Sequence, residues 1–356
     1  MHMADALLSP AVGGSMWAVS AAAIAYCSKK VRTELDDDKA PLMGVLGAFL
    51  FAAQMINFTI PATGSSGHLG GGLLLAILLG PHAAFLTMAS VLVVQALFFA
   101  DGGLLALGCN IFNMGFIPAC IVYPLVYRQL VGTNPSRARL TTAIVVSAVI
   151  GLQLGPLAVA LETVLSGISA LPFSTFALLM QPVHLAIGIV EGLVTAAIIS
   201  LVYKARPEIL ARVRETRPSG SIPLRNITLA FLAAALITGG IISRFASKNP
   251  DGLEWAIKRT TGATELEAMK AGIHGALASL QERTAFLPDY TFRKPDGESK
   301  GGAAPMVERT KPGETGRNAA GNKLATSVSG LIGGGITLGL ALMCGFLLRK
   351  KPQPAA

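Results

Sequence analysis

The chain has 356 residues, of which 52% are hydrophobic and only 14% are charged, and its mean hydropathy is +0.58. Soluble domains carry about 25% charged residues, so this chain lacks nearly half of the charge that usually solvates a protein surface. Its apolar residues occur in blocks of about 20, the length that a helix needs to cross a bilayer. The composition excludes a soluble enzyme, a fibre and a disordered chain, and it predicts an all-α polytopic membrane protein.

The net charge of +9 comes largely from basic residues that gather at the ends of apolar segments. Such retention of Lys and Arg is typical of the cytoplasmic loops of membrane proteins, and it argues against nucleic acid as a partner. The four cysteines form no CxxC pair, so neither a disulfide framework nor a structural zinc site is expected. The basic clusters lie at 29–32, 128–139, 204–225 and 349–351.

Nine apolar segments are expected to cross the membrane. If the four basic clusters are cytoplasmic, the first segment runs inward, which gives an external N-terminus and a cytoplasmic C-terminus in a bacterial cell membrane. The segment at 71–81 is closer in length to a re-entrant segment than to a full span. In chain order the segments are 11–27, 41–58, 71–81, 83–100, 103–127, 138–163, 182–203, 226–246 and 326–348.

A change in composition after Arg225 divides the chain into two membrane regions. The first is expected to be a body of seven segments, and the second a hairpin of two segments joined by a large external loop. In that loop we expect a short amphipathic helix from Glu265 to Phe286 and a disordered Gly-, Lys- and Pro-rich run from Lys294 to Lys323. The expected divisions are the body 1–205, a basic cytoplasmic linker 206–225, the hairpin 226–348 with its loop 247–325, and a cytoplasmic tail 349–356.

The first two residues, Met1 and His2, form a chelating pair. The α-amine, the His2 amide nitrogen and the His2 imidazole can close a five-membered and a six-membered ring on one metal ion. These three nitrogens lie in a plane and leave one planar position for a ligand from elsewhere. Square-planar nitrogen sites favour Ni(II) or Cu(II) over Zn(II). The chemistry requires that Met1 is retained and unblocked, and the opening residues lack the basic region of a signal peptide.

His68 is the candidate for the fourth ligand, because it is the only strong metal ligand in the small-residue loop PATGSSGHLGGG at 61–72. The expected topology places this loop on the same side of the membrane as residue 1. An ionisable residue in apolar surroundings is a functional candidate. An N-terminal His, however, is usually frayed, and a loop His usually only forms hydrogen bonds. The residues alone leave both interpretations open.

Several stretches resemble the nickel/cobalt substrate-binding subunits of energy-coupling factor transporters. They are the N-terminal MH before a leucine and Ser-Pro, TGSSGHLGGGLLLAILLGP at 63–81, QALFFADGGLLALGCNIFNMG at 95–115 and HLAIGIVEGLVTAA at 184–197. This resemblance covers about residues 1–205. The tail, with NPDGLE at 249–254, resembles the small accessory subunit of the same transporters, which is often fused behind the substrate-binding subunit.

The resemblance implies a transport subunit, not an enzyme. It implies that the transported metal, Ni(II) or else Co(II), is held by the Met1 amine, the amide and imidazole of His2, and His68, with no organic cofactor. The nearest approach to a phosphate-binding loop, GRNAAGNK at 316–323, has Asn where such a loop needs Lys. The resemblance therefore implies separate ATPase subunits and a transmembrane coupling subunit as partners.

Further polar and small residues have two interpretations each. Polar residues in apolar context either orient the His rings around the metal or form hydrogen bonds between helices; they are Gln95, Asp101, Asn110 and Asn113. Small residues of the first segment either meet the coupling subunit or pack within this chain; they are Ala18, Ala21, Ala22 and Ala25. His184 either helps metal to enter or only packs, and a ligand role for His82 is doubtful.

Two other classes of protein remain open alternatives. A stand-alone secondary cation carrier is expected to show repeated halves and acidic residues at mid-membrane. The sequence shows no internal repeat, and Glu162 and Glu191 are the only acidic residues well within the expected spans. An intramembrane metalloenzyme would need a motif such as HExxH, and no two of the five His residues are four positions apart.

Overall fold

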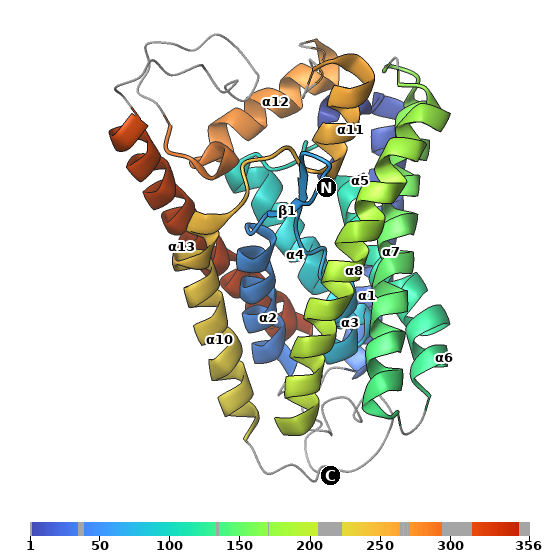
Figure 1. Cartoon of the computed structure of the whole chain (residues 1–356), viewed down its shortest axis with the longest axis vertical. Coiled ribbons are helices and arrows are strands. Elements are labelled where there is room, and N and C mark those ends of the chain that lie inside the picture. The colour runs from blue at the N-terminus through green and yellow to red at the C-terminus, as the bar shows by residue number, and fades with distance from the viewer. Residues whose placement is uncertain are drawn as a thin grey trace.

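The computed structural model of the protein describes residues 2–34, 39–132, 135–169, 171–205, 223–263, 266, 269, 271–293 and 315–348. The described chain is a bundle of helices with a single short β-hairpin among its described residues (Figure 1). Six described helices are long and apolar enough to cross a membrane: 10–33, 81–99, 107–131, 137–166, 173–205 and 323–348. The predicted all-α polytopic membrane fold is confirmed.

The body of the molecule is built from the helices of residues 2–205. In chain order these are α1 (Pro10–Glu34), α2 (Lys39–Gln54), α3 (Gly72–Leu79), α4 (Pro81–Phe99), α5 (Leu107–Asn110), α6 (Arg128–Val131), α7 (Arg137–Ser166) and α8 (Phe173–Ala205). A π-helix, Ile111–Tyr127, joins α5 to α6, and it contains Pro118 and Pro124. Because proline has no N–H to donate, these two residues favour the wider turns of this segment.

Helix α3 is the element whose length the sequence left uncertain. It has only eight residues, so it rises about 12 Å, less than half of the hydrocarbon thickness of about 30 Å. All eight residues are buried. The chain reaches α3 through the β-hairpin of β1 (Phe58–Ile60) and β2 (Ser65–Gly67), in which Phe58 pairs with Gly67.

Several boundaries differ from the prediction: α1 ends at Glu34 rather than 27, α10 ends at Gly240 rather than 246, and three further differences have a physical reason. Helix α8 begins at Phe173 rather than 182 and contains Pro182 in its interior, because prolines are tolerated within helices that neighbouring helices support in a membrane. Helix α2 ends at Gln54, four residues before the expected limit, where the polar hairpin begins. Helix α13 (Thr315–Leu348) begins within the run expected to be disordered, so the prediction of disorder is wrong for 315–323. The rest of that run, 294–314, lies outside the described residues.

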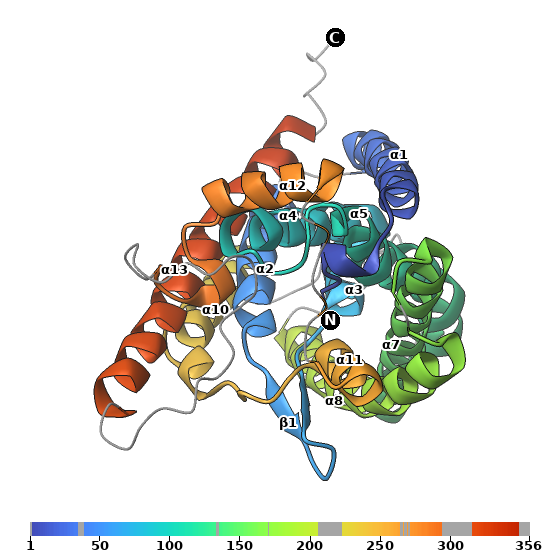
Figure 2. The same cartoon turned by 90° about the horizontal axis from the view of Figure 1, so that it is seen from above.

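The second membrane region, called the accessory region below, comprises the described residues between 223 and 348. In it, α10 (Leu224–Gly240) and α13 pack side by side along α2 (Figure 1). A Cβ atom on Gly330 would lie 2.5 Å from the Gly239 carbonyl oxygen, so the two helices cross at a point where only glycine fits. Between them, α11 (Gly252–Thr261) and α12 (Gly272–Thr284) lie across the end of the body that holds residues 2–9 (Figure 2). The amphipathic helix expected over 265–286 is thus present as the shorter α12.

Candidate metal site

The N-terminal segment enters the body and is anchored there by its third residue. Met3 is fully buried, and its backbone N–H donates to Asn110 Oδ1 at 2.8 Å. The Met3 carbonyl in turn accepts from Asn110 Nδ2 at 3.3 Å and from the Gly103 N–H at 2.9 Å. These bonds fix where the preceding His2 lies. Met1 lies outside the described residues, so its predicted role as a ligand stays a prediction.

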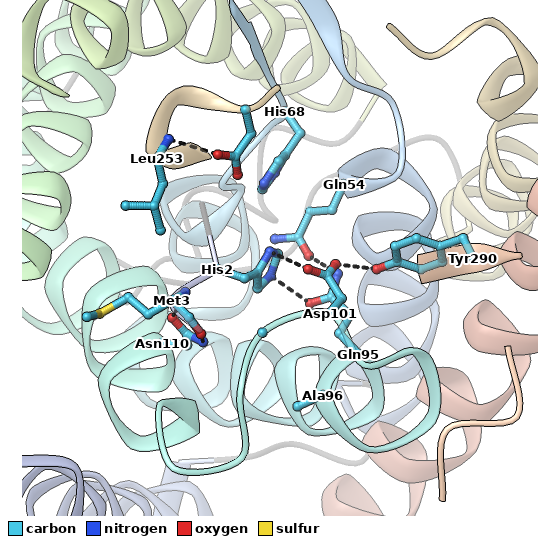
Figure 3. A network of polar contacts seen from close by, with 12 residues as sticks. His2, Met3, Gln54, His68, Gln95, Ala96, Asp101, Asn110, Leu253 and Tyr290 are labelled. Atoms are coloured by element: carbon cyan, nitrogen blue, oxygen red, sulfur yellow. Dashed lines mark hydrogen bonds and ion pairs between the residues drawn. The ribbon is translucent and has the colours of Figure 1, made fainter. Parts of the chain in front are cut away.

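The His2 imidazole lies between two polar side chains of the body (Figure 3). Its Nδ1 is 3.1 Å from Asp101 Oδ1, and its Nε2 is 3.2 Å from Gln95 Oε1. On its other side the ring stacks on the His68 ring, with a centroid distance of 5.4 Å and an interplanar angle of 16°. The structure therefore brings together the two imidazoles that the sequence singled out.

The backbone after His68 is held by one buried carboxylate. Glu191 of α8 accepts hydrogen bonds from the Gly70 N–H at 2.6 Å and the Gly71 N–H at 3.0 Å. Gly71 has a φ of +75° and is the residue before α3 begins, a conformation that favours glycine. Glu191 therefore places a negative charge at the N-terminus of α3, where the helix dipole stabilises it.

A chain of amides joins the His68 loop to His2 and fixes the direction of each hydrogen bond (Figure 3). Gln54 Nε2 donates to the Gly70 carbonyl at 2.9 Å, so Gln54 Oε1 is the acceptor for Gln95 Nε2, also at 2.9 Å. Gln95 Oε1 then remains to accept from His2. Since a carbonyl can only accept, the chain assigns a proton to His2 Nε2.

The accessory region covers this site and contributes to it. Ser66 of β2 donates through its N–H to the Pro250 carbonyl at 2.8 Å and through Oγ to the Asn249 carbonyl at 2.7 Å. Trp255 of α11 donates through Nε1 to the Thr63 carbonyl at 3.0 Å. The Tyr290 hydroxyl donates to Asp101 Oδ2 (Figure 3). The accessory region thus contacts both the His68 loop and the carboxylate beside His2.

The electrostatics of the site follow from its burial. Burial lowers the pKa of His68 to about 3, and its Nδ1 lies 3.1 Å from the Leu69 carbonyl, so Nδ1 carries the proton of the neutral ring. Burial alone would raise the pKa of Asp101, but the charge of the adjacent His2 holds it below its usual range. The site thus contains one neutral imidazole and one carboxylate that stays ionised.

The other predicted residues fall in different places. Asn110 contacts Met3 rather than either His ring, and Asn113 donates to Glu162 Oε2 at 2.8 Å. His184 is buried in α8, and His82 lies edge-on to Tyr26, 5.8 Å away. The small residues of α1 are all exposed rather than packed within the described chain; these are Ala18, Ala21, Ala22 and Ala25.

Sequence reasoning did not assign three residues to this arrangement. Gln54 carries a detectable signal, because it is a polar residue near the end of an expected span, and such residues are functional candidates. Glu191 was recognised as an acid within a span but was not connected to the His68 loop. Nothing in the sequence distinguishes Tyr290 from other residues of the polar loop.

The described side chains do not form a complete metal site by themselves. Over the described ranges, no three His, Cys, Asp or Glu side chains are grouped so as to hold a metal ion. A metal ion between His2 and His68 would therefore need further ligands of another kind, such as backbone nitrogens.

Comparison with known proteins decides the family. Residues 2–209 match CbiM, the family described as "Cobalt uptake substrate-specific transmembrane region". The chain belongs to the CbiM family. Residues 225–350 match the PDGLE domain, so a CbiM region and a PDGLE region are fused in one chain. The resemblance seen in the sequence, a substrate-binding subunit fused to its accessory subunit, is confirmed.

Relatives and a solved structure agree with this assignment. A Haloquadratum walsbyi protein named for metal transport is 37% identical over 212 residues, which cover 59% of this chain and 93% of that protein. The fused nickel transport protein NikMN of Rhodobacter capsulatus is 31% identical over 318 residues, which cover 82% of this chain and 88% of the relative. The crystal structure of a transition metal transporter matches with a TM-score of 0.52 and 31% identity, covering 60% of this chain and all of that one. This CbiM-family chain is a membrane metal transport protein and not an enzyme.

Proposed function

We propose that this CbiM-family protein captures Ni(II) for import in a square-planar site of four nitrogens. The ligands are the Met1 α-amine, the His2 amide nitrogen, His2 Nδ1 and His68. The observation that carries the proposal is the stacking of the His2 and His68 rings, 5.4 Å apart, in a buried end of the body. The lack of a three-side-chain group among the described residues favours a site completed by backbone nitrogens.

The hydrogen bonds around His2 suit this role. Chelation through the amide and the ring uses Nδ1, because only Nδ1 closes a six-membered ring. The amide chain through Gln95 assigns the proton to Nε2, which leaves Nδ1 as the nitrogen that exchanges a proton for a metal ion. Second ring nitrogens of metal-bound His residues usually donate to such an acceptor. Nδ1 faces Asp101 in this structure, so metal binding requires Nδ1 to turn from the carboxylate to the metal.

Nickel is favoured over cobalt by two arguments. A planar nitrogen site suits Ni(II), and the affinity of such ligands rises from Co(II) to Ni(II). Fused relatives carry nickel transport in their names, as in Rhodobacter capsulatus. Co(II) is the alternative, since the family is described by cobalt uptake. Competition between the two ions, with bound metal measured by mass spectrometry, decides between them.

Import needs an energy source from other subunits. We assign it to cytoplasmic ATPases and a transmembrane coupling subunit of the energy-coupling factor type. The exposed alanines of α1 are the proposed contact with the coupling subunit, because small residues allow close helix approach. The N-terminus is then external and the C-terminus cytoplasmic. Replacing Ala21 by Leu should abolish co-purification of the coupling subunit and leave nickel binding intact.

The site itself is tested by the nickel content of the purified full-length protein. Wild type and a His82→Ala control should bind one equivalent of nickel, whereas His2→Ala and His68→Ala should bind almost none. Adding one residue before Met1 should also abolish binding, because it moves the α-amine away from the chelate. A stand-alone carrier or a metalloenzyme that does not use the α-amine would tolerate the extension. Retention of full nickel binding by the extended protein would therefore refute the proposal.

A further inference from the structure

A cavity with a mostly apolar lining and a few polar groups lies directly beside the His2–His68 site. It has about 40 Å³ of space for the centres of water-sized molecules, room for roughly three waters. It is lined by the His68 loop, the start of α3, the π-helix, α7, α8 and the accessory residues Asp251 and Gly252. His184 and Glu191 line it from the same helix, and their separation of seven residues places them about 10 Å apart along the axis. The cavity therefore reaches from His68 into the middle of the body.

Three buried polar atoms that line this cavity have no hydrogen-bond partner among the described residues. They are His184 Nε2, Asn113 Oδ1 and Ser147 Oγ, and their side chains are 1%, 3% and 0% exposed. An unsatisfied polar group inside a protein costs free energy comparable to a lost hydrogen bond. Polar groups at membrane depth that face a cavity are typical of transport pathways.

The His184 ring is prepared for metal ligation. Its Nδ1 lies 2.8 Å from the Met180 carbonyl, which can only accept, so Nδ1 carries the proton and Nε2 carries the lone pair. A backbone carbonyl on one ring nitrogen is the usual arrangement that orients the other nitrogen towards a metal. Gly252 of the accessory region packs against this ring, since a Cβ atom there would lie 2.7 Å from Cε1 and 3.1 Å from Nε2.

We propose that His184 Nε2, with the oxygen atoms of Asn113 and Ser147, forms a second, low-affinity transit site for the divalent transition-metal ion. Resting on the proposed function, this site receives the ion when His68 gives it up, with water completing an octahedral shell. One imidazole among neutral oxygens binds less tightly than four nitrogens. Because the described residues hold no three-side-chain group of His, Cys, Asp or Glu, the ion is not retained there. The replacement of His68 by His184 exchanges one neutral ligand for another, and the release of the ion from the His2 amide nitrogen and Nδ1 returns to them the protons that they lost on binding.

The first experiment detects the site directly with Co(II), whose visible absorption reports its ligands. Full-length His68→Ala protein, which lacks a ligand of the first site, is titrated with Co(II) alone. We expect weak binding with the spectrum of an octahedral N/O site, and a loss of affinity of roughly tenfold when His184→Ala is added. Equal Co(II) binding by the single and the double variant would overturn the proposal. His82→Ala, added in place of His184→Ala, is the matched control.

The second experiment leaves the His184 side chain in place and crowds its lone pair with Gly252→Ala. We expect nickel uptake by cells carrying the whole transporter to fall roughly tenfold, while the purified protein still binds nickel at equilibrium within about twofold of wild type. Gly335→Ala is the matched control, because a Cβ there meets nothing within 4 Å. Unchanged uptake, or a parallel loss of uptake and binding, would contradict a transit role. If the proposed function itself is wrong, a different result shows it: nickel binding will not depend on His2.

Discussion

The hydroxyl of Tyr290, in the accessory region, donates a hydrogen bond to the carboxylate of Asp101 in the body. The other oxygen of Asp101 lies 3.1 Å from His2 Nδ1. The accessory region therefore reaches the proposed ligand through a single intermediate side chain. Tyr290 thus holds the carboxylate that faces the ligand nitrogen of His2 in the metal-free protein, across a separation of 189 residues.

Replacing Tyr290 by Phe should weaken nickel binding without unfolding the protein. The variant removes the hydrogen bond that Tyr290 donates to Asp101, so Asp101 should hold His2 Nδ1 more strongly, and nickel, which must displace this contact, should bind roughly tenfold more weakly. Isothermal titration with nickel measures this change. Tyr203→Phe, at a side chain 37% exposed, should bind nickel as wild type does. An unchanged affinity in Tyr290→Phe would show that the contact between Tyr290 and Asp101 does not influence metal binding.

The hydrogen bonds between the Gln54 and Gln95 amides should affect nickel affinity as strongly as the Asp101 carboxylate does. Gln54→Leu removes both the donor to Gly70 and the acceptor for Gln95. Gln95 can then rotate and present its NH₂ group to His2, which no longer assigns the proton to Nε2. We expect nickel affinity to fall by roughly tenfold. Gln153→Leu is the control, because the Gln153 side chain donates to the backbone carbonyls of Leu152 and Gln181, away from the His2–His68 site.

Glu191→Gln should loosen the His68 loop. A Gln side chain can accept from only one of the two glycine N–H groups that Glu191 binds, and a hydrogen bond to a charged group contributes roughly 1.5–3 kcal/mol. Both thermal stability and nickel affinity should decrease. The comparable change Glu162→Gln, at a buried acid that contacts Asn113 rather than the loop, should lower stability with little effect on affinity. If the two changes altered nickel affinity equally, Glu191 would not be the residue that positions His68.

The stability of the metal-free protein should decrease in mild acid. The pKa of His68 is about 3 in the folded protein, against 6.5 for a free His side chain. Between these values the unfolded chain binds a proton that the folded chain does not, so the free energy of unfolding falls as the pH drops from about 6.5 towards 3. Thermal melts in detergent across this range measure the slope. His68→Gln should flatten it, and an unaltered slope would mean that His68 is not the group responsible.

Nickel itself should stabilise the folded protein. A ligand that binds only the folded state at 1,000 times its dissociation constant adds about 4 kcal/mol, so the melting temperature should rise with nickel and return to its starting value with chelator. Co(II) should produce a smaller rise. His2→Ala should show neither, and a nickel-dependent rise in that variant would place the metal elsewhere in the protein.

The pattern of apolar segments was sufficient to predict the membrane fold, but it placed several boundaries wrongly. The seventh expected segment, 182–203, begins at Pro182, a residue that usually interrupts a helix. In the structure the apolar residues before it continue α8 back to Phe173. The start of α13 was missed for a different reason, because the polar residues from Thr315 onwards are typical of a loop.

The two His residues of the candidate site were predictable, because each has distinctive neighbours in the sequence. The residues that contact them were only partly predictable from the sequence. Gln95 and Asp101 stood out as polar residues in an apolar context, and both lie against His2. Tyr290 could not be predicted, since its role depends on how the accessory region folds back over the body. Contacts between distant segments have no local signature in a single sequence.

Helix α3 limits how His68 can move. All eight of its residues are buried, and a close-packed interior changes between discrete arrangements rather than deforming smoothly. Helix α3 therefore stays in place, and the segment between Gln54 and Gly71 is the part that moves relative to it. Gly64 and Gly71, both with φ of +75°, lie in this segment and can serve as its hinges. A disulfide or cross-link that joins this segment to α3 should trap the protein with its metal ion bound.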